Sequence, residues 1–175
     1  MSTTLRQGMW IQSDAQARVT LSLMKTYVNE AIRDHEFVWW VRERIDNIAP
    51  VTIMNRDWAG VARAVRDYVA AHIRFCPDPS GVENITAPLD HMKFLRSHRV
   101  LLGDCDDAAT LSAAMGKALG IPAEFRILAF YKPDNPYQHV VTYLHPRGGL
   151  VIDMDTTRPQ QNLPPVPTRS FSIRV

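Results

Sequence analysis

Cys105, His139 and an aspartate, either Asp153 or Asp155, follow one another along the chain in an order that suits thiol chemistry. A helix is expected to begin at the cysteine, where exposed N–H groups and the helix dipole favour a thiolate. The histidine lies in an expected strand and can accept the thiol proton, while a carboxylate on the next strand can orient the imidazole. The pattern therefore predicts a base-activated thiol with an oriented imidazole.

The two aspartates compete for the place beside the imidazole. A connection formed by residues 145–147 sets His139 opposite Asp153, whereas a connection formed by residues 145–149 sets it opposite Asp155. Side chains alternate along a strand with a period of two, so both carboxylates point to the same face. Counting residues leaves the choice open.

Three acidic residues lie next to the cysteine in the sequence: Asp104, Asp106 and Asp107. One carboxylate about 6 Å from the sulfur, at an effective dielectric constant of ~20, disfavours a thiolate by roughly 3 kcal/mol. A helix N-terminus stabilises a thiolate by only about 0.3–1 kcal/mol. The thiolate therefore requires either a protonated His139 in contact with it, or carboxylates that point away into helix caps and salt bridges.

The elements that must position these residues begin with helices. Apolar residues at helical spacing, without Pro or Gly, predict one long helix or two consecutive helices from about residue 14 to residue 47. A further amphipathic helix is expected after Asn55, and a short helix at Asp90–Ser97. The helix that begins with the nucleophile is expected at 105–119, because a glycine and a proline follow it closely.

Strands are expected in the last part of the chain, at Ala123–Phe130, Gln138–Leu144 and Leu150–Asp153. Their short connections indicate antiparallel hairpins. From Pro159 the tail is rich in proline and is predicted to form an extended arm, whose alternating run at 170–173 could add as an edge strand to this sheet or to a neighbour's. The order of elements predicts an α+β fold, with N-terminal helices packed on a small antiparallel sheet.

Length and composition bound the class of protein. The 175 residues suit one domain, with a helical N-terminal region (1–50), a core (51–158) and the tail (159–175). The formal net charge of +2 gives no indication of nucleic-acid binding. Two cysteines are too few for a cysteine-rich metal cluster or a disulfide framework, which favours a reducing compartment. No signal-type or bilayer-spanning apolar segment is found, so we expect no export and no membrane partner.

The motif Gly103-Asp104-Cys105-Asp106-Asp107-Ala108-Ala109 resembles the nucleophile motif of the transglutaminase-like superfamily, whose members share a papain-like fold. Gln138-His139-Val140 is similar to the histidine strand of that family, and Val151-Ile152-Asp153 is similar to its aspartate strand. The resemblance extends over about residues 56–157.

The resemblance implies a role for each member of the site. Cys105 is implied as the nucleophile and His139 as the general base and acid. Asp153 is favoured over Asp155 as the residue that orients the imidazole. The implied function is that of a cysteine peptidase or amidase, which hydrolyses a peptide or other amide substrate without a cofactor or metal. Hydrolysis is favoured over cross-linking, because no calcium-binding pattern is found.

The whole layout, with helices before the motif, also resembles short transglutaminase-like proteins encoded among the structural genes of tailed phages. This second resemblance implies a rival hypothesis, in which the chain is a structural or assembly protein of a phage particle with a weak or inactive triad. Other virion or assembly proteins would then be its partners, bound through the N-terminal helices and the tail. The expected location is therefore cytoplasmic or virion-associated.

Several other residues could do chemistry. Cys76 could form a disulfide with Cys105 or act as a second thiol, although its place before a proline is typical of a chain turn. His91 and His98 are spaced for one helix face, but no third metal ligand has suitable spacing. His145 is a weaker alternative to the strand histidine because it lies in a turn before a proline.

Overall fold

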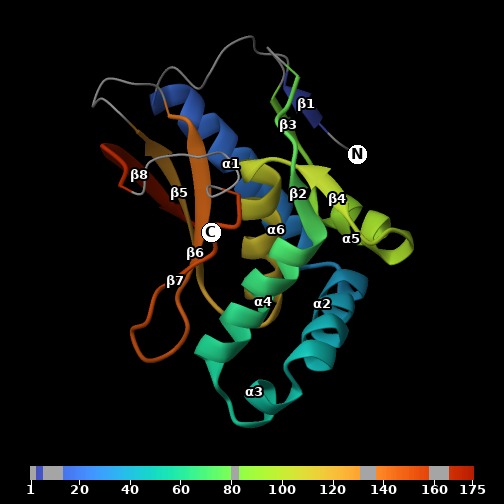
Figure 1. Cartoon of the computed structure of the whole chain (residues 1–175). Coiled ribbons are helices and arrows are strands. Elements are labelled where there is room, and N and C mark those ends of the chain that lie inside the picture. Colours follow the sequence, from blue (N-terminus) through green and yellow to red (C-terminus); the bar gives the residue numbers. More distant parts are fainter. Residues whose placement is uncertain (1–2, 6–13, 80–82, 131–136, 158–165) are drawn as a thin grey trace.

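The computed structural model describes residues 3–5, 14–79, 83–130, 137–157 and 166–175 (Figure 1). Most of the expected connection before the second strand and the proline-rich start of the tail lie outside these ranges. Within them, helices are followed by a sheet, so the predicted α+β plan is confirmed. No helix in these ranges combines the length and the apolar composition that crossing a bilayer requires.

The helices are α1 (Asp14–Ala31), α2 (His35–Ile48), α3 (Pro50–Met54), α4 (Trp58–His72), α5 (Pro88–Ser97) and α6 (Cys105–Ala118). The expected stretch from 14 to 47 is divided into two helices at Asp34, whose carboxylate accepts the N–H of Phe37 at 2.8 Å and caps α2. Asp57 caps α4 in the same way, by accepting the N–H of Gly60 at 2.9 Å. The short α3 was not expected from the sequence.

The four-stranded antiparallel sheet contains β5 (Ala123–Ala129), β6 (His139–Leu144), β7 (Ile152–Asp153) and β8 (Arg169–Arg174) in the order β7-β6-β5-β8. The first three confirm the expected hairpins, although β7 is shorter than expected. β8 is the alternating run of the tail, and it pairs with β5 so that Phe171 lies opposite Ile127. The tail strand therefore joins its own sheet (Figure 1).

Two small strand pairs lie outside this sheet. β1 (Thr3–Leu5) pairs antiparallel with β3 (Glu83–Ile85), and β2 (Ile73–Phe75) pairs parallel with β4 (Leu101–Gly103). Neither pair was expected from the sequence, because three-residue strands carry almost no periodic signal. β4 ends two residues before Cys105, so the parallel pair leads the chain directly into α6.

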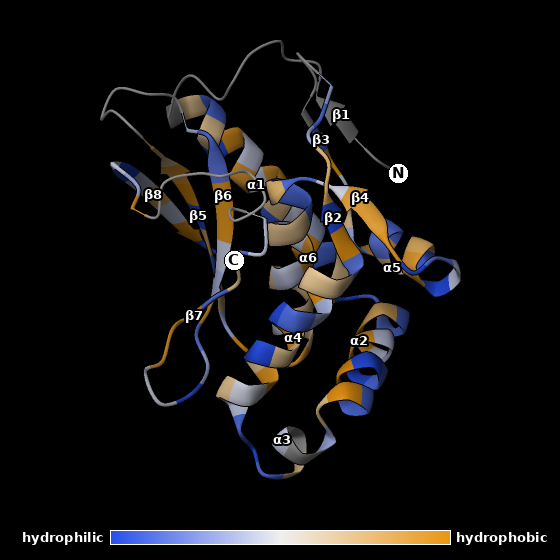
Figure 2. Ribbon diagram, viewed as in Figure 1, coloured by the Kyte–Doolittle hydropathy of each residue, from blue (hydrophilic) through white to orange (hydrophobic). Residues whose placement is uncertain are grey.

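The amphipathic helices bury their apolar faces in one core. Figure 2 shows α2 and α4 with alternating apolar and polar segments, as expected for helices that are buried on one side only. α2 buries Phe37, Trp40, Val41 and Ile45, and the core that they enter also includes residues of α1, α4, α6 and the sheet. Because one core joins these elements, the helices hold α6 against the sheet.

α6 packs along β6, and the two elements run in the same direction. The hydroxyl of Thr142 donates to the carbonyl of Ala109 at 2.7 Å. Further along both elements, a Cβ added to Gly116 would lie only 2.4 Å from a methyl carbon of Leu144, so the glycine permits the close approach. The first residue of α6 and the first residue of β6 therefore lie at the same end of the packed pair.

Candidate active site

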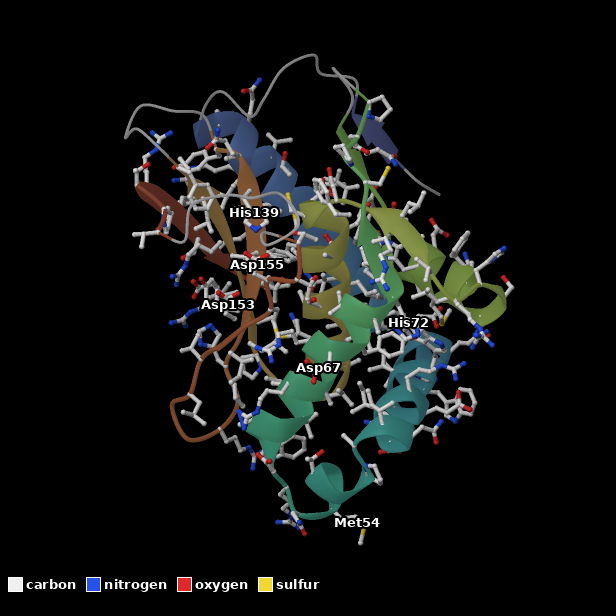
Figure 3. All side chains as sticks on the ribbon, viewed as in Figure 1. Met54, Asp67, His72, His139, Asp153 and Asp155 are labelled. Atoms are coloured by element: carbon white, nitrogen blue, oxygen red, sulfur yellow. The ribbon has the colours of Figure 1, made fainter. Side chains whose placement is uncertain are left out.

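A buried hydrogen bond joins His139, the first residue of β6, to Asp155, which follows β7. His139 Nε2 and Asp155 Oδ2 are 2.8 Å apart, and the two side chains are 0% and 4% exposed (Figure 3). The ring of Phe130 lies beside the imidazole, with 6.4 Å between the ring centroids. A hydrogen bond to a carboxylate is stronger when water is excluded, so this contact holds the imidazole in a defined orientation.

Asp153 has a different place from the one that the sequence favoured. β6 and β7 pair Tyr143 with Asp153, and the connection between the strands runs from 145 to 151, so neither expected register is correct. Asp153 Oδ1 accepts the N–H of Asp155 at 2.8 Å, which turns the chain out of the strand. This turn brings Asp155 to His139. Asp155, and not Asp153, therefore forms this hydrogen bond with the imidazole.

Cys105 is the first residue of α6 and is partly exposed. It lies at the same end of the α6–β6 pair as His139. Neither cysteine forms a disulfide, so the pairing considered for Cys76 and Cys105 is not formed. Cys76 lies just after β2 and is exposed.

The acidic residues around Cys105 form the start of α6. Asp104 Oδ1 accepts the N–H of Asp106 at 3.2 Å. The Asp104 carboxylate also accepts the N–H of Asp107, and Asp107 Oδ2 accepts the N–H of Asp104 at 3.3 Å, so Asp104 and Asp107 form a reciprocal capping box. Burial raises the pKa of the Asp104 carboxyl, and the nearby Asp107 carboxylate raises it further. Two of the three carboxylates that could destabilise a thiolate at Cys105, those of Asp104 and Asp107, are thus engaged in the cap of α6.

The same acidic group is the candidate for a metal site. Among the residues that the structure describes, one oxygen from each of Asp104, Asp106 and Asp107 lies within 4.8 Å of the others. The capping box already uses two of these carboxylates, and helix starts favour acidic residues without any ion. The formation of the helix start therefore accounts for this arrangement.

The remaining candidate histidines lie apart from this hydrogen bond. His98 is exposed and stacks on Phe94 with 4.1 Å between the ring centroids, whereas His91 is fully buried, so the two do not share a site. His145 follows β6, and its Nε2 lies 3.6 Å from Oε2 of Glu124 on β5, whose Oε1 is 2.9 Å from the guanidinium of Arg126.

Sequence reasoning missed that His91 Nε2 lies 3.6 Å from Asp107 Oδ1. The spacing of the apolar residues could have shown that His91 is buried, since it lies on the same face of α5 as the apolar residues. The buried residues of α5 are Pro88, His91, Met92 and Leu95. A histidine on the buried face of a helix needs a polar partner, and that partner lies on α6.

Comparison with known proteins supports the family resemblance. The model of the transglutaminase-like superfamily matches residues 50–151, which is more than half of the chain. No curated protein matches the chain. These comparisons do not show the similarity to tailed-phage proteins, which stays a prediction.

One solved structure shares the fold. It is the crystal structure of a protein from Parabacteroides distasonis described as a "putative protease", with a TM-score of 0.56 and 16% sequence identity. The match covers 90% of this chain and 29% of that chain. At this identity the likeness concerns the fold alone, and this chain spans less than a third of the other protein's length.

Proposed function

Because this chain belongs to the transglutaminase-like superfamily, we propose that it is a cysteine hydrolase that cleaves a peptide or other amide bond. Cys105 is the proposed nucleophile, His139 the general base and acid, and Asp155 the residue that orients the imidazole. The observation that carries the proposal is the buried 2.8 Å hydrogen bond between His139 Nε2 and Asp155 Oδ2.

The tautomer of the imidazole follows from this hydrogen bond. An ionised carboxylate accepts only, so His139 Nε2 must donate, and Nδ1 is the nitrogen that can accept a proton from a thiol. The carboxylate also stabilises the imidazolium that forms after the proton transfer. Asp155 thus does for His139 what the third member of a catalytic triad does.

The proposed reaction has two stages. In the first, Nδ1 of His139 takes the proton of Cys105, the sulfur bonds to the carbonyl carbon, and the imidazolium returns the proton to the amine that leaves. In the second, the imidazole takes a proton from water, the oxygen attacks the carbonyl carbon of the thioester, the carbon–sulfur bond breaks to release the acid, and the imidazolium returns the proton to the sulfur of Cys105. Water is the proposed acceptor, and the protease-like fold neighbour supports hydrolysis over cross-linking.

Alkylation with iodoacetamide tests the pair. The rate of modification of each cysteine is measured against pH by mass spectrometry of the digested protein. Below neutral pH we expect Cys105 to react faster than Cys76, because the imidazolium of His139 stabilises the Cys105 thiolate. This faster reaction should vanish in His139→Ala. Equal, slow labelling of both cysteines, unchanged by His139→Ala, would contradict the proposal.

A further inference from the structure

His91 of α5 is a second buried imidazole, and the proposed reaction does not use it. The residue is 0% exposed, and its Nε2 lies 3.6 Å from Asp107 Oδ1 on α6. Burial of a charged or polar pair costs solvation, and an apolar pair of similar volume is often as stable. The presence of this pair at the start of the helix that carries the nucleophile therefore points to a role beyond packing.

Asp107 connects three segments of the chain. Its Oδ1 accepts the N–H of Thr86 at 2.8 Å, its Oδ2 accepts the N–H of Asp104 at 3.3 Å, and His91 approaches from α5. Burial alone would raise the pKa of Asp107, but the contact with His91 and the N–H of Thr86 outweigh it and hold that pKa below its usual range. The group is therefore a carboxylate held from several sides.

The backbone on both sides of Cys105 depends on this carboxylate and its neighbour. The carboxylate of Asp107 accepts the N–H of Asp104, the residue before Cys105. The carboxylate of Asp104 in turn accepts the N–H of Asp106, the residue after Cys105. A Cβ added to Gly103 would lie 2.6 Å from Asp107 Oδ2, so the glycine lets the carboxylate close onto the backbone. If the Asp107 carboxylate moved, the backbone on both sides of Cys105 would therefore move with it.

We propose that His91 and Asp107 form a second imidazole–carboxylate pair that positions Cys105, with His91 acting through Asp107. The inference rests on the proposed function, because it concerns the same thiol. His139 and Asp155 orient the base, while His91 and Asp107 orient the helix start that presents the nucleophile. Both sides of the thiol–imidazole contact are then set by a buried imidazole–carboxylate pair.

The test measures the alkylation rate of Cys105 in the folded protein, together with the free energy of unfolding. His91→Leu removes the contact with Asp107, and we expect alkylation below neutral pH to slow by about tenfold, because a small misplacement of reacting groups is costly. His91→Gln keeps a donor near the position of Nε2 and should restore most of the rate. A purely structural histidine would change the unfolding free energy without changing the rate.

A double-mutant cycle tests whether His91 acts through Asp107. Asp107→Asn should slow alkylation about as much as His91→Leu, and the double variant should be no slower than either single variant. If His91→Leu does not fold, Asp107→Asn provides the same test alone. Asp34→Asn is the matched control, because it alters the cap of α2, which carries no nucleophile, and should leave the alkylation rate unchanged.

The outcomes separate this inference from the proposed function. If His139→Ala slows alkylation while His91→Leu and Asp107→Asn do not, the positioning role is wrong and the proposed function stands. Additive effects of the two substitutions would also overturn it, because His91 would then act independently of Asp107. If His139→Ala leaves the rate unchanged, the proposed function itself fails.

Discussion

The two cysteines follow the same pair of parallel strands but have different surroundings. Phe75 and Gly103 are partners across β2 and β4, and the N–H of Cys76 donates to the carbonyl of Gly103 at 2.9 Å. Cys76 is exposed and precedes Pro77, whereas Cys105 begins a buried helix. A thiol in this fold is thus a candidate nucleophile because of the helix that begins at it and the strand that packs against that helix.

Replacing each thiol in turn is the strongest test of this comparison. Cys105→Ser should lower amide hydrolysis by about 1,000-fold or more, because a serine hydroxyl is a poor nucleophile at a site built for a thiolate. Cys76→Ser should leave turnover unchanged. Both are measured on a fluorogenic peptide library with the folded state checked by circular dichroism. Full activity in Cys105→Ser would remove this residue from the mechanism.

The hydrogen bond between His139 and Asp155, at the same end of the α6–β6 pair as Cys105, is the next difference between the surroundings of the two cysteines. Asp155→Asn should reduce turnover by about 100-fold or more, because the amide no longer stabilises the imidazolium or selects the tautomer. Asp153→Asn keeps an oxygen that can accept the N–H of Asp155, so its loss should stay below about tenfold. Steady-state kinetics of both variants measure the two losses. A larger loss in Asp153→Asn would show that Asp153, which the sequence resemblance favours, orients the imidazole.

Gly103 distinguishes the strand that leads to Cys105 from its partner. In Gly103→Ala the new Cβ meets the carboxylate of Asp107, so we expect a loss of about 1–3 kcal/mol in the free energy of unfolding. Urea denaturation measures this loss. Leu102→Ala on the same strand is the control; Leu102 is 67% exposed, so the change should stay within about 0.5 kcal/mol. Equal stability of Gly103→Ala and the unmodified chain would contradict the close approach.

The acidic residue before Cys105 gives the smallest expected effect. Burial raises the folded-state pKa of Asp104 above its value in the unfolded chain, so the stability that this carboxyl contributes at low pH is lost as the pH rises through the folded pKa. Asp104→Asn keeps an N-cap residue and does not titrate. The free energy of unfolding of the variant, relative to the unmodified chain, should therefore increase from pH 4 to pH 7. A constant difference across this range would contradict the raised pKa.

Local patterns in the sequence predict most of the fold, including the helix that begins at Cys105 and the strand that begins at His139, two members of the candidate site. Helical periodicity and the caps around Asp104 predicted the helix that begins at Cys105, and alternating runs predicted the strand that begins near His139. These features depend on residues close together in the chain. The α+β plan and the hairpins followed from their order.

The parts that sequence reasoning missed depend on distant residues or on a single turn. The choice of Asp155 over Asp153 is made by the turn after β7, and the register depends on a connection longer than either that was counted. The partner of His91 lies on another helix, and the β2–β4 pairing joins strands separated by all of α5. Neither leaves a periodic signal.

The parallel pair β2–β4 also has a consequence for local opening. It contains two short strands, whereas β5 has a partner on each side and its register is held along its whole length. Two-stranded pairs are only marginally stable by themselves, so the amide protons of Leu101–Gly103 should exchange with solvent far sooner than those of β5. Heating would then separate the strand that leads to Cys105 before the sheet melts, and the reactivity of the thiol would decline at a lower temperature than the global fold.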